Sequence, residues 1–190
     1  MKKGRIFVIS APSGTGKSTV VEGLLHRFPH LAYSVSCTTR SPRVAEHQGV
    51  DYHFVDRDTF MSMRQDGEFV EWAEVHGELY GTPRQPLKEA VERGLDIVLD
   101  IDVQGGLAIK DAFPEAVTIF LLPPSFEVLK ERLAGRGTDS PEQIRIRLEN
   151  ARNELSYKDR YDHHIINDEV SKALDELAKL IHSTAPNSDV

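Results

Sequence analysis

The chain has 190 residues, of which 39% are hydrophobic, and this suits one compact domain with a buried core. It carries 23 Lys and Arg against 30 Asp and Glu, and the resulting net charge of −7 excludes a general nucleic-acid binder. No apolar run approaches the about 20 residues of a membrane helix, and the single cysteine, Cys37, cannot form an intramolecular disulfide, so we expect a cytoplasmic protein without membrane or nucleic-acid partners.

Apolar segments rich in β-branched residues alternate with amphipathic segments, which predicts an α/β fold with a parallel sheet and crossover helices. The predicted strands are Arg5–Ser10, Asp96–Ile101, Ala116–Leu122 and His163–Ile166. The predicted helices run from Lys17 to about Phe28, from Pro83 to about Arg93, onwards from Ser125, from Ser140 towards Leu155, and over about 169–182. Pro83 is expected at the first helical position and Gly94 at the stop, and Ser140 with Gln143 predicts a capping box.

The segment from about Ser34 to Tyr80 breaks this alternation and predicts an inserted antiparallel lobe. Strands are expected at Tyr33–Val35, Tyr52–Val55 and Glu68–His76, with a short helix after Asp56. A second polar interruption, Gly135–Asp139, suits a mobile flap. The predicted division is a core at 1–33, 83–134 and 158–183, a lobe at 34–82, a lid at 135–157 and a tail at 184–190.

A phosphate-binding loop joins the first strand to the first helix and reads Ala11-Pro12-Ser13-Gly14-Thr15-Gly16-Lys17-Ser18. Its glycines let successive N–H groups and the helix N-terminus face a polyphosphate. Lys17 is expected to reach the β- and γ-phosphates, and Ser18 to offer its hydroxyl to Mg²⁺. Ala11 stands where the motif has its first glycine, which is a small change. The loop predicts a nucleoside triphosphate and magnesium.

The remaining motifs separate the classes of P-loop protein. The Asp-x-x-Gly of GTPase switches occurs at Asp102–Gly105, and Thr38 or Thr39 could serve as a switch threonine. The purine-reading Asn-Lys-x-Asp is missing from the sequence, however, so the switch interpretation is rejected. Paired arginines and tyrosines in the lobe suit a terminal monophosphate, because the planar fork of arginine binds phosphate bidentately.

The chain resembles the guanylate kinase family over nearly its whole length. The resemblance rests on the P-loop and on Ser36-Cys37-Thr38-Thr39-Arg40-Ser41-Pro42-Arg43, Leu79-Tyr80-Gly81-Thr82 and Asp100-Ile101-Asp102-Val103-Gln104-Gly105. This family transfers the γ-phosphoryl group of ATP to GMP. The resemblance implies a P-loop NTPase-type parallel sheet core with helices on both faces, an inserted antiparallel GMP-binding lobe and a lid. It implies ATP and GMP as substrates and Mg²⁺ as cofactor, and it leaves the oligomeric state open.

The resemblance also implies a role for each matching residue. The GMP phosphate would be held by Arg40, Arg43, Tyr52 and Tyr80, and guanine would be read or positioned by Ser36, Glu71, Thr82 and Asp102. ATP would contact residues 11–18 together with Arg132, Asn167 and Asp168. Mg²⁺ would be held by Ser18 and Asp100, and the catalytic group would be Lys17, Arg43, Arg136 and Arg147.

Structural roles compete with several of these assignments. Asp100 and Asp102 could simply cap the following helix, and Arg136 and Arg147 could be solvated surface charges. Trp72 is expected to be a core residue, because Phe69 and Val75 occur in the same strand region. Cys37 is expected to be a small packing residue, since nothing beside it would act as its general base.

A binding module is the main alternative to an enzyme. Guanylate-kinase-like domains also occur in scaffold proteins that bind phosphorylated peptides in the GMP site. Such domains have usually lost the working P-loop, whereas Gly14, Gly16, Lys17 and Ser18 are all present here. The sequence therefore favours the enzyme.

Overall fold

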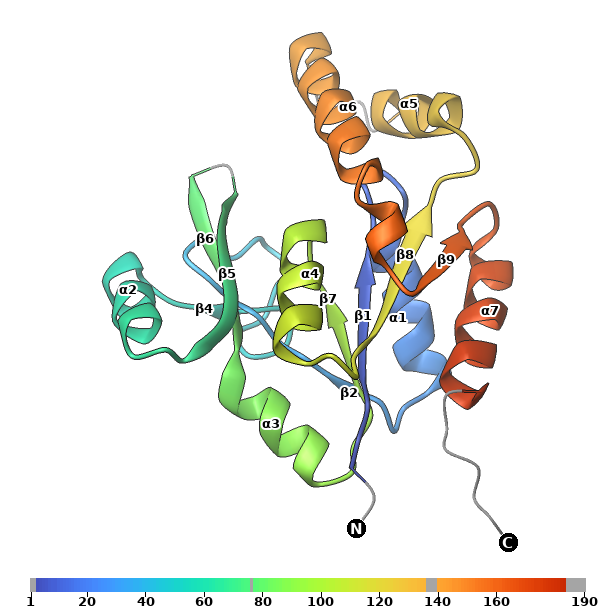
Figure 1. The fold of residues 1–190 in the computed structure, drawn as a ribbon. Coiled ribbons are helices and arrows are strands. Elements are labelled where there is room, and N and C mark those ends of the chain that lie inside the picture. Colours follow the sequence, from blue (N-terminus) through green and yellow to red (C-terminus); the bar gives the residue numbers. More distant parts are fainter. Residues whose placement is uncertain (1–2, 76, 136–139, 184–190) are drawn as a thin grey trace, which may run out of the picture. The chain divides into compact units, whose positions relative to one another are not determined.

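The computed structural model describes residues 3–75, 77–135 and 140–183 (Figure 1). Its strands are β1 (Ile6–Ser10), β2 (Ala32–Tyr33), β3 (Cys37–Thr38), β4 (His53–Phe54), β5 (Phe69–Val75), β6 (Glu78–Pro83), β7 (Ile97–Asp100), β8 (Val117–Leu122) and β9 (His163–Ile166). Its helices are α1 (Lys17–Arg27), α2 (Arg57–Gln65), α3 (Arg84–Glu92), α4 (Val103–Ala112), α5 (Phe126–Ala134), α6 (Pro141–Leu155), the 3₁₀ turn η1 (Lys158–Arg160) and α7 (Val170–Ser183).

The chain forms two compact units. The first comprises Met1–Val8 and His30–Val117, and the second comprises Ile9–Pro29 and Thr118–Val190. The predicted division into core, lobe and lid stays a prediction. None of the described helices is long and apolar enough to cross a membrane.

The core sheet has the strand order β2-β7-β1-β8-β9. β2 and β7 pair in parallel, with Ala32 opposite Ile97, and β8 and β9 pair in parallel, with Ile119 opposite His163. Every residue of β1 is buried, as is expected for a strand that is covered on both faces. The predicted α/β class and the four predicted core strands are confirmed.

Apolar side chains from β1, α3, β7 and α4 form the sheet-side core of the first unit. They are Ile6, Val8, Leu87, Ala90, Ile97, Leu99, Ile109 and Ala116. α3 begins after Pro83 and ends before Gly94, which takes a positive φ of 76° at the stop, as predicted. Pro83 itself was predicted wrongly: it is the extended N-cap of α3 and the last residue of β6, because Arg84 N–H bonds to the Glu68 carbonyl there.

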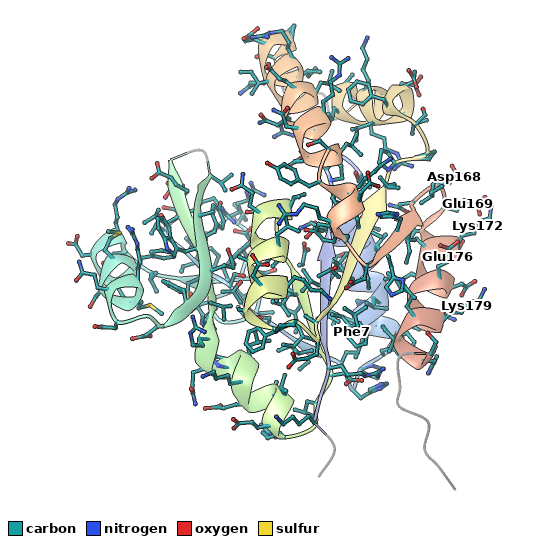
Figure 2. All side chains as sticks on the ribbon, viewed as in Figure 1. Phe7, Asp168, Glu169, Lys172, Glu176 and Lys179 are labelled. Carbon is teal, nitrogen blue, oxygen red and sulfur yellow. The ribbon has the colours of Figure 1, made fainter. Side chains whose placement is uncertain are left out.

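Amphipathic helices cover the sheet in the second unit. α7 packs against α1 and β9 through its buried face, formed by Ala173, Leu177, Ala178 and Ile181. The opposite face of α7 carries Lys172, Glu176 and Lys179, which point outward in Figure 2 together with Glu169 just before the helix. This spacing of apolar and charged residues is that of a helix with one buried side. The predicted capping box of α6 is also confirmed, since Ser140 and Gln143 bond to each other's backbone N–H groups.

The second sheet differs in part from the predicted antiparallel lobe. Its strand order is β4-β3-β6-β5, and β3 pairs antiparallel with β6 but parallel with β4. A strand was expected at Tyr33–Val35 at the start of this lobe, whereas the structure has β2 at Ala32–Tyr33, in the core sheet beside β7. β3 was not predicted, because two residues are too short to show a period, and β6 was not predicted as a strand. The short helix after Asp56 is confirmed as α2, whose N-cap Asp56 accepts from Thr59 N–H.

One face of this sheet packs against α2. Its buried core is Cys37, Phe60, Phe69 and Leu79, and the Phe60 and Phe69 rings stack with centroids 4.5 Å apart. A Cβ on Gly81 would lie 2.9 Å from the Phe69 ring, so this position requires glycine. Cys37 is confirmed as a packing residue, and burial raises the pKa of its thiol to about 11.

Trp72 is not in the core, contrary to prediction. Its side chain is 39% exposed, and the Arg64 guanidinium lies 3.8 Å from its ring centroid. Val75, on the same strand, is also exposed. β5 is the edge strand of its sheet, so water can reach side chains on either of its faces, and the sequence of β5 does not reveal this.

These positions predict a clear difference in stability between two aromatic substitutions. Phe60→Ala removes a fully buried ring and should lower the free energy of unfolding by about 3–5 kcal/mol. Trp72→Ala removes a ring that water already reaches and should cost about 1 kcal/mol. Urea unfolding of both variants measures the difference. Equal losses would contradict the placement of the lobe core.

Candidate functional site

The P-loop in the second unit has the backbone that a phosphate cradle requires. Gly14 and Gly16 have φ values of 90° and 92°, in the left-handed region that favours glycine. Thr15 N–H bonds to the Pro12 carbonyl at 3.1 Å, and α1 begins directly afterwards at Lys17. Residues 11–19 line a hollow of about 240 Å³. The hollow therefore opens onto the N-terminus of α1, where an anion is stabilised.

Two predicted ATP-side residues lie against the backbone of this loop. The Asn167 side-chain amide donates to the Thr15 carbonyl at 2.7 Å, and the Arg132 guanidinium donates to the same carbonyl at 3.1 Å. Arg132 also donates to the Asn167 carbonyl at 3.1 Å. Both side chains thus hold the loop backbone through the Thr15 carbonyl. Their contact with ATP stays a prediction. Asp168 is exposed just before α7 (Figure 2).

The lid region contributes a residue to the P-loop that sequence reasoning missed. Glu154, near the end of α6, accepts a hydrogen bond from Ser13 N–H at 3.1 Å. A carboxylate oxygen therefore contacts one of the N–H donors of the loop. Arg147 lies half-buried on the same helix, and Arg136 lies outside the described residues. Their catalytic roles stay predictions.

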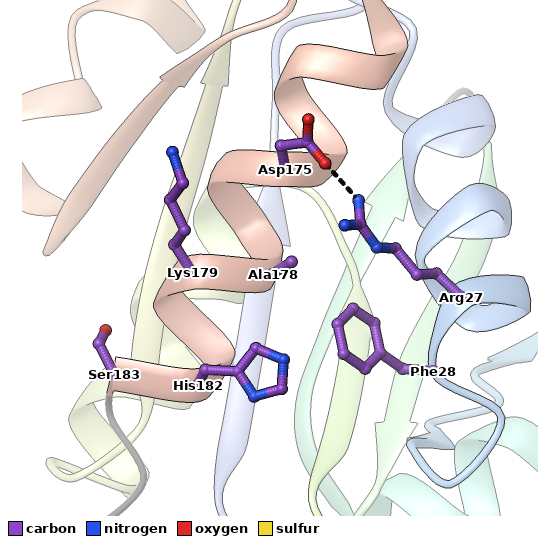
Figure 3. Close-up of a pocket in the computed structure, with 7 residues that line it drawn as sticks. All are labelled: Arg27, Phe28, Asp175, Ala178, Lys179, His182 and Ser183. Atoms are coloured by element: carbon purple, nitrogen blue, oxygen red, sulfur yellow. Dashed lines mark hydrogen bonds and ion pairs between the residues drawn. The ribbon is translucent and has the colours of Figure 1, made fainter.

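A larger groove of about 800 Å³ lies at the C-terminal ends of α1 and α7 (Figure 3). Side chains that line it contact one another. Arg27 pairs with Asp175 at 2.6 Å, and the rings of Phe28 and His182 meet edge to face at 5.6 Å. The groove contains none of the predicted site residues, so we do not assign the chemistry to it.

The predicted phosphate-binding residues of the lobe come together in the first unit. The Arg40 guanidinium lies 5.5 Å from the Tyr52 ring centroid, and the rings of Tyr52 and Tyr80 meet at 6.0 Å in a T-shaped arrangement. The hydrogen bond to Glu46 is the main cause of a raised pKa of Arg40, and the proximity of Tyr80 contributes less. The Arg43 side chain is exposed on the following loop. Three of the four predicted residues therefore form one cluster.

Glu46 belongs to this cluster and was missed. Its two carboxylate oxygens accept from the two terminal nitrogens of Arg40 at 2.9 Å each, and one of them also accepts from Arg43 N–H at 2.8 Å. The hydrogen bonds from Arg40, with that from Arg43, hold the pKa of Glu46 down at about 2. The pair spans six positions in a loop, where no sequence period could reveal it. Glu46 thus fixes the arginine fork and the start of the loop.

The predicted guanine-reading residues centre on Glu71. Glu71 on β5 faces Thr82 on β6, and the Thr82 hydroxyl donates to the Glu71 carboxyl at 2.5 Å. Burial, followed by the negative charge of Asp102, raises the pKa of Glu71 to about 7 even though the Thr82 hydrogen bond lowers it. Asp102 caps α4 by accepting from Gly105 N–H at 2.8 Å, so its predicted structural role is real. Ser36 lies just before β3, where its carbonyl accepts from His53 N–H.

β6 connects the cluster of predicted phosphate-binding residues with the predicted guanine-reading residues. Alternate residues of a strand share a face, so Tyr80 and Thr82 lie on the same side of β6. Gly81 and Leu79 face the aromatic core on the opposite side. One strand therefore presents Tyr80, which is predicted to bind the GMP phosphate, and Thr82, the partner of Glu71, two positions apart.

The predicted magnesium ligands have suitable chemistry. Ser18 offers a hydroxyl oxygen at the exposed start of α1, and Asp100 offers carboxylate oxygens at the end of β7. Oxygen donors of this kind are those that Mg²⁺ prefers. Ser18 belongs to the second unit and Asp100 to the first, so their joint action stays a prediction.

A P-loop that follows the first strand of a parallel sheet and opens a helix defines a P-loop nucleotide-binding protein. A sequence model of the family described as "Guanylate kinase" matches residues 3–184. Guanylate kinases of Rhodococcus jostii and Aromatoleum aromaticum are 46% and 48% identical to this chain, over 95% of its length in each case and 88% and 89% of theirs. A crystal structure of guanylate kinase from Anaplasma phagocytophilum superposes with a TM-score of 0.79 at 35% identity, covering 96% of this chain and 87% of that one. The chain belongs to the guanylate kinase family.

The raised pKa of Glu71 predicts how stability depends on pH. A carboxyl group whose pKa is about 7 when folded and 4.5 in its ordinary state binds its proton more tightly in the folded protein, so it makes stability fall as pH rises through this interval. Glu71→Gln removes the titration. Between pH 5 and pH 8, the free energy of unfolding of the variant should therefore gain on that of the wild type by on the order of 2 kcal/mol. Parallel curves in urea unfolding at the two pH values would contradict a raised pKa.

Proposed function

We propose that this protein transfers the γ-phosphoryl group of ATP to GMP, giving ADP and GDP, in the cytoplasm and with Mg²⁺. Membership of the guanylate kinase family supports this reaction. The observation that carries it furthest is the arrangement along β6, where Tyr80 contacts the phosphate cluster and Thr82 binds Glu71. This arrangement suits a ligand with a phosphate at one end and a hydrogen-bonding base at the other.

Glu71 is proposed to read the guanine base. Guanine presents N1–H and the N2 amino group as adjacent donors, which a single carboxylate can accept together. Adenine presents an unprotonated N1, whose lone pair would face the carboxylate. The Thr82 hydroxyl fixes the orientation of the Glu71 carboxyl, and Ser36 and Asp102 are proposed to complete the base site. Rejection of AMP then comes from repulsion as well as from an unsatisfied partner.

The GMP phosphate is proposed to bind at Arg40, Arg43, Tyr52 and Tyr80. Glu46 holds the Arg40 fork and the Arg43 backbone in place before the ligand arrives, which reduces the ordering that binding requires. The second pKa of a phosphate monoester is about 6, so its oxygen is already an anionic nucleophile at neutral pH. The reaction therefore needs no side-chain base.

ATP is proposed to bind at the P-loop, with Lys17 at its phosphates, Arg132 as a lid arginine, and Asn167 and Asp168 on the adenine side. Mg²⁺, held by Ser18 and Asp100, would neutralise charge on the β- and γ-phosphates when bound. Lys17, Arg43, Arg136 and Arg147 would stabilise the charge that spreads over the transferred group. The lobe at 34–82 and the lid at 135–157 are proposed to close over the nucleotides and exclude water.

The Lys17→Ala variant tests the proposed phosphoryl transfer. Lys17 lies at the start of α1 and is proposed to act on bound phosphates, so the variant should fold normally and lose at least about 10³-fold of the rate of GDP formation. Lys179→Ala, on the outer face of α7, is the matched control and should keep wild-type activity. Product formation is followed by chromatography with ATP and GMP as substrates. Near-normal turnover in a folded Lys17→Ala protein would refute the P-loop assignment.

The Glu71→Gln variant tests the reading of guanine. Replacing one acceptor oxygen by an amide donor should lower kcat/KM for GMP by about 10²-fold or more, because sites built on hydrogen bonds discriminate strongly. The slow reaction with AMP should improve, since the amide no longer repels the adenine N1 lone pair, and the gap between GMP and AMP should narrow. Glu74→Gln, on the same strand and exposed, is the control. If the wild type uses AMP as well as GMP, or if Glu71→Gln keeps its GMP activity, the assignment of the base site is wrong.

A further inference from the structure

Gly105 is a glycine whose backbone does not require one. It is the third residue of α4 and has helical geometry, with its N–H bonded to the Asp102 side chain at 2.8 Å. Alanine is more favourable than glycine in a helix, because glycine loses more conformational freedom on folding. Neither turn geometry nor a positive φ therefore explains a glycine at this position.

The space around Gly105 is filled by the carboxyl group of Glu71. A Cβ built on Gly105 would lie 3.0 Å from Oε2, 3.2 Å from Cδ and 3.5 Å from Oε1 of Glu71, and these are its three nearest heavy atoms. α4 packs against β5 at this point. The first of these distances is tighter than nine in ten real Cβ contacts, so an added methyl group would have to displace its neighbour by a few tenths of an ångström.

We propose that Gly105 is a positioning residue for guanine selectivity: the missing side chain leaves the space in which the Glu71 carboxylate stands, held on its other oxygen by Thr82. The inference rests on the proposed role of Glu71 in reading guanine. Oε1 is bound to the Thr82 hydroxyl, whereas Oε2 is the oxygen that a methyl group at position 105 would approach most closely. The glycine thus controls where the second acceptor oxygen lies.

A substitution at Gly105 should therefore affect stability and selectivity differently. The group that must move is the end of a flexible side chain, so Gly105→Ala should fold, with a thermal midpoint equal to or above that of the wild type because of the gain in helix propensity. The displaced carboxylate should bind guanine less well. A purely structural glycine would give the opposite result, a loss of stability that lowers all activities together.

The experiment compares steady-state kinetics of the wild type and Gly105→Ala with GMP and AMP as acceptors. We expect the KM for GMP to rise about tenfold, kcat and the KM for ATP to change little, and the reaction with AMP to stay the same, since small misplacements of a recognition group are costly. Asp111→Ala, at the exposed end of the same helix, is the control for helix propensity and should behave as the wild type. An unchanged KM for GMP, or a lowered thermal midpoint with equal losses for both acceptors, would overturn the inference.

A double-mutant cycle with Glu71→Asp gives a second test. The shorter side chain withdraws the carboxyl group from position 105, so Glu71→Asp should cost less in the Gly105→Ala background than in the wild type. Additive losses would overturn the inference. Glu71→Gln, measured in parallel, distinguishes the positioning role of Gly105 from the reading of guanine by Glu71. If Glu71→Gln weakens GMP use and Gly105→Ala does not, the positioning role alone fails; if neither does, the reading of guanine by Glu71 fails as well.

Discussion

The proposed base site depends on the Glu71 carboxyl group, which must ionise where water is largely removed. In the proposed function, burial makes Glu71 selective, because water cannot satisfy its oxygens when the wrong base is bound. The same burial, with the nearby charge of Asp102, raises the pKa of Glu71 to about 7. The Thr82 hydroxyl compensates in part by donating to the carboxyl group, and the clearance at Gly105 lets that group keep its place. The register of β5 and β6 places Thr82 beside Glu71, and the packing of α4 against β5 places Gly105 beside it.

Both proposed phosphate sites are already in contact with carboxylates of the chain itself. Glu46 accepts from the Arg40 fork and from Arg43 N–H, and Glu154 accepts from Ser13 N–H in the P-loop. These contacts satisfy donors that would otherwise be costly to leave unpaired. In the proposed reaction, an incoming phosphate shares or replaces an existing anion at each site. The observed free energy of binding is then the difference between gaining the phosphate contacts and losing the carboxylate contacts.

Local chemistry explains what the sequence could predict. The P-loop, the cap of α2 at Asp56 and the capping box at Ser140 are contiguous motifs whose residues act on their own backbone, and the structure confirms them as elements. The core strands were visible because they are continuous apolar runs. The resemblance of short motifs to guanylate kinases identified the family, which the comparisons confirm.

Contacts between distant segments could not be predicted in the same way. Glu154 is 141 positions from Ser13, and Asn167 is 152 positions from Thr15, so no spacing connects them. β3 has two residues and shows no alternation, and Trp72 was misassigned because its strand lies at the edge of the sheet. Gly105 belongs to a motif that points to the family, but its clearance for Glu71 depends on how α4 packs against β5.

The protonation of Glu71 is the most direct test of this account. Carbon NMR of the Glu71 carboxyl carbon, assigned by its absence in Glu71→Gln, can be followed from pH 4 to pH 9 with and without GMP. The account predicts an apparent pKa of about 7 in the free protein. It also predicts a fall of one unit or more, on the order of the energy of a charged hydrogen bond, when guanine donates to the carboxylate. A pKa at the ordinary value of 4.5 in the free protein, or one that GMP leaves unchanged, would contradict it.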